Sequence, residues 1–146
     1  MTSQHNDIDV LGVAATTDRL TEIRDFVLQN VSGLGFSDFE QNNVVLAVDE
    51  ACANLIQHAY RNDPSKSISI RIIVSPKEIR VEISDTSAPF DPNTAELPDM
   101  RAYFAEHRHH GLGILLMTRV MDDIQYLPGT GPGAANMLIL TKRLTA

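Results

Sequence analysis

The chain has 146 residues, of which 43% are hydrophobic, enough for one ordinary domain to bury its own core without disulfides or metals. Its 12 basic and 19 acidic residues give a net charge of −7, which argues against direct contact with nucleic acid or with anionic membranes. The sequence has no signal-peptide pattern and no stretch near the roughly 18 apolar residues of a membrane span. We therefore expect a single domain over residues 1–146 and a cytoplasmic protein.

The first predicted elements are a short strand and a helix. Residues Ile8–Ala15 can form the strand, after which Thr16 or Thr17 is a suitable N-cap. Apolar residues then recur at steps of three and four until the Gly33–Gly35 segment ends the helix.

A longer helix is predicted from Ser37 to about Tyr60. Ser37 and Glu40 are spaced as a capping box, in which each side chain accepts a backbone N–H of the other residue. The only cysteine, Cys52, falls inside this helix, where a small buried side chain is expected. One apolar stripe follows helical spacing and should face the core; its members are Val44, Val48, Ala51, Leu55 and Ala59.

The second half of the chain is predicted to be mainly strands. Alternation in Ser67–Val74 and Ile79–Ser84 predicts an antiparallel hairpin, and the aperiodic stretch from Asp85 to His110 is typical of a long functional loop. This pattern predicts an α+β sandwich, with helices on one face of a mostly antiparallel sheet. Three further elements complete it: an apolar helix over Gly111–Asp123 and strands at Ile124–Leu127 and Met137–Thr141.

Two polar residues lie beside the apolar stripe of the long helix. Glu50 and Asn54 are four residues apart, so they share one helix face. They can simply be part of the solvated face of an amphipathic helix. Alternatively, the Asn54 oxygen can ligate Mg²⁺ while Glu50 orients or deprotonates a hydroxyl group or a water. Spacing alone leaves both interpretations open.

Two further segments carry residues that suit a nucleotide. Asp85 can end a strand and begin a turn, or its carboxylate can accept the amino hydrogen of adenine with Phe90 packed nearby. Gly111 and Gly113 flank a predicted helix start, which favours a phosphate, although they can equally form a tight loop. The basic run Arg108–His110 slightly favours an anion, while a solvated cluster is the ordinary interpretation of such a run.

The order of these motifs resembles one protein family. Glu50 and Asn54 on a long helix, D-x-x-x-P-F-D-P from Asp85, G-L-G-I before a helix and N-x-L-x-L-x-K at residues 136–142 are similar to the serine/threonine-protein kinase anti-sigma factors. These proteins belong to the GHKL ATPase superfamily. The resemblance implies a Bergerat-type ATP-binding two-layer sandwich, with residues of about 86–110 as the ATP lid.

The resemblance also implies roles for individual residues. Asn54 would bind Mg²⁺, Glu50 would be the catalytic base, and Asp85 would hold adenine. The remaining residues of the implied ATP site are Phe90, Arg108, His110, Gly111, Leu112 and Gly113.

Family members of this kind typically sequester a sigma factor and phosphorylate a Ser or Thr of an anti-anti-sigma partner of the STAS fold. The resemblance therefore implies a protein serine/threonine kinase, and the new phosphate dianion would disrupt the packed interface by desolvation and repulsion. Relatives often dimerise, so a homodimer is compatible with it. The alternative is a non-catalytic interaction module of the same fold, because Ser87 stands where many relatives have glycine.

Overall fold

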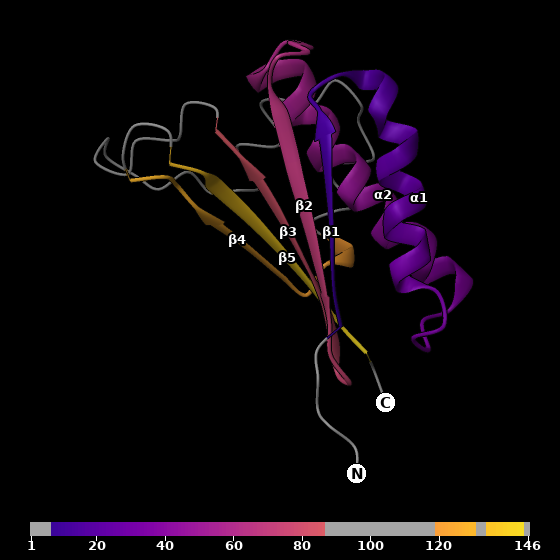
Figure 1. Cartoon of the computed structure of the whole chain (residues 1–146). Coiled ribbons are helices and arrows are strands. Elements are labelled where there is room, and N and C mark those ends of the chain that lie inside the picture. Colours follow the sequence, from indigo (N-terminus) through magenta and orange to yellow (C-terminus); the bar gives the residue numbers. More distant parts are fainter. Residues whose placement is uncertain (1–6, 87–118, 131–133, 145–146) are drawn as a thin grey trace.

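The computed structural model describes residues 7–86, 119–130 and 134–144. These residues form two layers, a five-stranded sheet and a pair of helices along one of its faces (Figure 1). The strand order is β1-β2-β3-β5-β4, and every neighbouring pair is antiparallel. The predicted α+β sandwich is confirmed.

The strands lie close to their predicted positions. Alternating burial along β2 and β3 reflects the period of two in their sequences, with every second residue facing the helices. β2 and β3 form the predicted hairpin, and β1 adds to the free side of β2. The bounds are Asp7–Ala14 for β1, Ser67–Val74 for β2, Glu78–Asp85 for β3, Asp123–Leu127 for β4 and Asn136–Arg143 for β5.

The predicted helix over Gly111–Asp123 extends too far. Asp122 is already bound to β5, because its N–H donates to the Thr141 carbonyl at 2.8 Å and its carboxylate accepts the Arg143 N–H at 2.6 Å. Asp123 then begins β4. Pairing with a distant strand thus ends a segment whose local sequence favours continuation of the helix.

The first helix begins later than predicted. The Thr16 hydroxyl donates to the Asp18 carboxylate instead of capping a backbone N–H. A 3₁₀ turn, η1, occupies Thr17–Arg19 before α1 runs over Leu20–Val31. The predicted stop is confirmed: Gly33 has a φ of 82°, a left-handed conformation that glycine adopts without a steric penalty.

α2 spans Asp38–Asn54 and begins with the predicted capping box. The Ser37 hydroxyl accepts the Glu40 N–H, and the Glu40 carboxylate accepts the Ser37 N–H, both at 3.1 Å. These bonds satisfy N–H groups that have no partner inside the helix, typically stabilising the helix by about 1 kcal/mol. The start of α2 is therefore fixed by local sequence.

The end of this helix differs from the prediction. After Asn54 the chain forms a π-helical turn, η2, over Leu55–Ala59, in which the Tyr60 N–H donates to the Leu55 carbonyl at 2.9 Å. This wider turn advances less per residue, so the buried face shifts to Ile56 and Tyr60. The predicted stripe is confirmed at Val44, Val48 and Ala51 and is wrong at Ala59, which is exposed.

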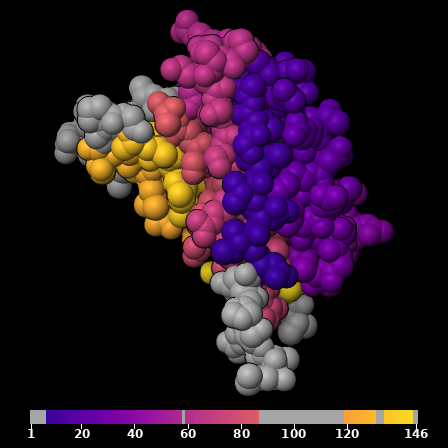
Figure 2. Space-filling view, viewed as in Figure 1, coloured from indigo at the N-terminus to yellow at the C-terminus, as the bar shows by residue number. Residues whose placement is uncertain are grey.

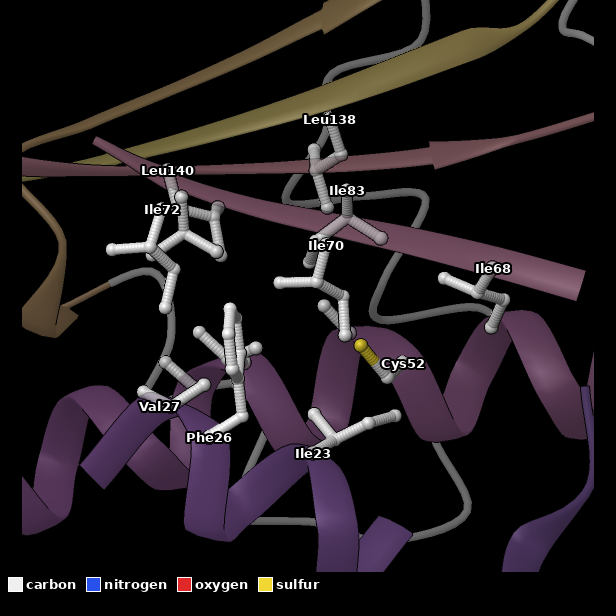
Figure 3. Close-up of a cluster of buried hydrophobic side chains, with 14 of the residues drawn as sticks. Ile23, Phe26, Val27, Cys52, Ile68, Ile70, Ile72, Ile83, Leu138 and Leu140 are labelled. Carbon is white, nitrogen blue, oxygen red and sulfur yellow. The ribbon is translucent and has the colours of Figure 1, made fainter. Parts of the chain in front are cut away.

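The core lies between the helices and the sheet. Figure 3 shows Ile23 and Phe26 of α1 pointing toward Ile70 and Ile83 of the sheet, with Cys52 of α2 in the same layer. Burial of each large apolar side chain contributes about 1.5–3 kcal/mol. Burial also raises the pKa of the Cys52 thiol, in agreement with its predicted place in the core. Among the residues described, no helix is long and apolar enough to cross a membrane.

The opposite face of the sheet is not covered by α1 or α2. Figure 2 shows β1 at the surface, with the helix layer packed along one side of it. Ile8 and Val10 alternate with the core-facing residues of β1 and are 54% and 57% exposed. Near them on this face, the Glu82 carboxylate forms ion pairs with two arginines. Its Oε1 lies 3.7 Å from Arg71 Nε, and its Oε2 lies 3.5 Å from Arg80 Nη1.

Candidate functional site

A hydrogen-bonded contact joins the end of the long helix to the end of β3. The Tyr60 hydroxyl accepts the Thr86 N–H at 2.5 Å and lies 3.3 Å from the Thr86 hydroxyl. Thr86 directly follows Asp85, while Tyr60 is separated from Asn54 by the η2 turn alone. The contact therefore places Asn54 and Asp85 at the same end of the two-layer structure.

Asp85 faces the interior at this end. The alternation that buries Ile79, Val81 and Ile83 against the helices continues to Asp85, which is 5% exposed. Asp85 is the last residue of β3, so its carboxylate lies where the apolar core ends. It is a buried acceptor and not the solvated turn residue that the sequence also allowed.

The amide of Asn136 holds this carboxylate. Asn136 is fully buried and lies directly opposite Asp85 in the β3–β5 register. Its Nδ2 donates to Asp85 Oδ1 at 3.1 Å, while its Oδ1 accepts the Gly129 N–H at 2.8 Å. Because the backbone N–H can only donate, this pair of bonds fixes which end of the amide faces Asp85.

Sequence reasoning did not single out Asn136 as a site residue. A signal was available. Asn136 lies two and four residues before Leu138 and Leu140 on β5, so it is on the same face of the strand, and both leucines face the core. A polar residue at a core-facing strand position needs a partner there. Which partner it has depends on the register between β3 and β5.

Gly129 is required for this arrangement. A Cβ added at Gly129 would lie 2.6 Å from the Ala134 carbonyl oxygen, a contact that real Cβ atoms do not make. Glycine therefore allows the two sides of the β4–β5 connection to approach and brings the Gly129 N–H to Asn136.

Asn54 is buried without the bonds that an amide normally makes. Its side chain is 4% exposed, and within the described part of the chain neither Oδ1 nor Nδ2 has a hydrogen-bond partner. Burying an unbonded amide costs about 1–3 kcal/mol, so the sequence tolerates a local loss of stability here. An amide oxygen is a suitable ligand for Mg²⁺, and this orphaned group fits such an ion. Asn54 is not on a solvated face.

Glu50 lies one helical turn before Asn54. It lies on the same face of α2 as Asn54, and it is partly buried. Along the helix it is located between the exposed first turn and the buried amide. A partly buried carboxylate on a rigid helix can orient a hydroxyl group and accept its proton.

Comparison with known proteins identifies the family. Residues 13–142 match the model of the histidine kinase-like ATPase domain. The chain belongs to this family. The predicted GHKL relationship is confirmed, and membership of this ATPase family implies that the domain binds ATP.

Individual relatives agree with the assignment. The domain is 32% identical over 99 residues to "Serine-protein kinase RsbW" of Bacillus subtilis (strain 168), covering 64% of this chain and 61% of that protein. It is also 32% identical over 108 residues to the protein of the same name from Bacillus cereus (strain B4264), covering 70% and 64%. This ATPase domain thus matches less than two thirds of the length of these relatives.

A solved structure supports the fold. The crystal structure of the RsbU and RsbW domains of a Mycobacterium tuberculosis protein superposes with a TM-score of 0.64 at 14% identity. The superposition covers 96% of this chain and 33% of that one.

The structure describes three of the predicted site residues of this ATPase domain: Asn54 and Asp85 lie at the same end of the two layers, and Glu50 lies one helical turn before Asn54 on α2. The other predicted residues and nearly all of the proposed lid lie outside the described residues, and their roles stay predictions. These residues are Phe90, Arg108, His110, Gly111, Leu112 and Gly113.

Proposed function

We propose that the chain is an ATP- and Mg²⁺-dependent serine/threonine protein kinase that acts as an anti-sigma factor. The observation that carries the proposal is the buried, unbonded Asn54 amide one turn after Glu50, at the end of the core where Asp85 lies. The ATPase family and the relatives named as serine-protein kinases support it.

Each residue has a defined task in this proposal. Asn54 Oδ1 would hold Mg²⁺, which supplies charge neutralisation at the nucleotide phosphates when bound. Asp85 accepts the adenine amino hydrogen, and Asn136 keeps the carboxylate in place. Glu50 orients the acceptor hydroxyl and takes its proton. A loose phosphoryl transition state mainly needs such alignment, which residues on a rigid helix and strand provide.

The proposed protein partners are a sigma factor and a STAS-type anti-anti-sigma factor that is the phosphate acceptor. A second copy of the chain is a further proposed partner. The exposed Ile8 and Val10, on the sheet face opposite α1 and α2, suit an apolar contact between copies. Light scattering after size-exclusion chromatography tests this last proposal, and an Ile8→Asp variant should shift a dimer toward monomer.

The deciding experiment combines binding with phosphate transfer. The purified chain is titrated calorimetrically with ATP with and without Mg²⁺, with GTP as the control nucleotide. γ-Labelled ATP is then supplied with each of a set of purified STAS-domain proteins. We expect Mg²⁺-dependent binding that prefers ATP, and transfer of label to a Ser or Thr of one STAS protein.

The Glu50→Ala variant separates catalysis from binding. It should bind ATP nearly as the wild type does but transfer no phosphate, because the substitution removes a base and not a nucleotide ligand. Undiminished transfer would refute the role of Glu50. ATP binding by the wild type without transfer to any STAS protein would contradict the kinase and favour the non-catalytic interaction module.

A further inference from the structure

One face of α2 runs from the solvent into the candidate site. With 3.6 residues per turn, Phe39, Asn43, Leu46 and Asn54 all project within about 40° of Glu50 around the helix axis. We refer to these five residues as the α2 stripe. Phe39 is 74% exposed and Leu46 is 46% exposed, whereas Asn54 is only 4% exposed. The exposed end of the stripe therefore carries two apolar side chains, Phe39 and Leu46, with the Asn43 amide between them. Glu50 follows, and the buried Asn54 lies at the end where the nucleotide is proposed to bind.

The apolar end of the α2 stripe is unusual in its placement. Phe39 has the largest exposed fraction among the large apolar side chains of the described residues. A single exposed apolar residue needs no explanation. Two exposed apolar residues in line with a proposed catalytic base suggest a binding surface. A protein substrate that brings a hydroxyl group to Glu50 has to extend over the surface next to it.

The charge of α2 limits what can bind there. The helix contains Asp38, Glu40, Asp49 and Glu50 and no basic residue, and Asp49 pairs with Arg24 of α1 at 3.3 Å. A segment that lies along this helix is favoured if it is neutral or basic. After phosphorylation the same segment carries a dianion, which the acidic helix repels.

We propose that Phe39 and Leu46 dock the segment of the protein substrate that contains the acceptor Ser or Thr. The inference rests on the proposed kinase function and adds a docking surface to it. The site proper positions the reacting groups, while Phe39 and Leu46 bind apolar side chains of the substrate segment.

The spacing along α2 predicts where those apolar side chains lie. At a rise of 1.5 Å per residue, Leu46 is about 6 Å and Phe39 about 16 Å from Glu50 along the helix axis. An extended segment advances about 3.3 Å per residue. The substrate should therefore carry one apolar residue about two positions and another about five positions from the acceptor, on the same side of it.

Steady-state kinetics tests the docking. The substrate is the STAS-domain protein that the wild-type chain phosphorylates. Leu46→Ala and Phe39→Ala should each raise KM for this protein by about fivefold to thirtyfold and leave kcat and ATP affinity unchanged, because they remove binding contacts remote from the reacting atoms. The matched control is Leu127→Ala, which truncates a leucine of β4 with a similar exposed fraction, 44%, and should leave KM unchanged.

Photo-crosslinking gives a second readout that does not depend on turnover. Cys52 is fully buried, so a Leu46→Cys variant has one accessible thiol, which can carry a benzophenone maleimide. On illumination with the purified STAS protein, the label should attach within a few residues of the acceptor. A Leu127→Cys variant with the same label should not crosslink to that segment.

The outcomes separate the two proposals. If the wild-type chain phosphorylates no STAS-domain protein, the proposed function fails and the docking inference fails with it. If transfer occurs but both alanine variants keep the wild-type KM, or if label at position 46 does not reach the acceptor segment, the docking inference alone is overturned.

Discussion

Truncation of Asn136 should weaken both the fold and the proposed adenine site. The Asn136→Ala variant loses two bonds, from Nδ2 to Asp85 Oδ1 at 3.1 Å and from the Gly129 N–H to Oδ1 at 2.8 Å. Asp85 is buried, and a lost partner at such a group costs about 1–3 kcal/mol. The two losses together should lower the free energy of unfolding by about 2–4 kcal/mol, or the Tm by roughly 7–15 °C.

The same variant should bind ATP roughly tenfold more weakly, because a displaced Asp85 carboxylate loses about one hydrogen bond to adenine. Urea denaturation gives the stability, and calorimetric titration with ATP gives the affinity. Asn42→Ala is the control, since Asn42 is an exposed residue of α2 and its truncation should change stability by less than about 0.5 kcal/mol. Equal unfolding midpoints for Asn136→Ala and Asn42→Ala would refute the structural link. Lower stability with unchanged ATP affinity would refute the role of Asn136 in positioning Asp85 for adenine.

Three further predictions concern single side chains. Asn54→Ala should leave the unfolding free energy unchanged or raise it by up to about 1 kcal/mol, because the amide has no hydrogen bond within the described structure. The same variant should weaken Mg²⁺-dependent ATP binding, and calorimetry showing wild-type affinity would count against Asn54 as a ligand. Gly129→Ala should lower the Tm, since its Cβ would lie 2.6 Å from the Ala134 oxygen, and an unchanged melting curve would contradict this. Burial raises the pKa of Cys52, so the folded thiol stays neutral above about pH 8.5, where the unfolded thiol ionises. The stability that this thiol contributes is fully present below that pH and falls as pH rises above it. Iodoacetamide at pH 8.5 should therefore modify Cys52 only after urea is added. Rapid modification without urea, detected by mass spectrometry, would refute this prediction.

Features that depend on neighbouring residues were predictable from the sequence. The capping box uses Ser37 and Glu40, whose side chains reach each other within one turn of helix. The β2–β3 hairpin follows from a period of two on both sides of a short turn. The shared helix face of Glu50 and Asn54 likewise follows from their spacing. Motif order was sufficient to predict the family that the comparison confirmed.

Features that depend on distant residues required the tertiary structure. Asn136 meets Asp85 because packing of β3 against β5 sets their register, and a shift by one residue would turn both side chains to the other face. β5 likewise ends the helix before β4 by binding Asp122. Local sequence determines helix caps and periodicity because the interacting groups are already adjacent along the chain. Only the folded core decides which polar groups become buried, and so which of them are available to a ligand.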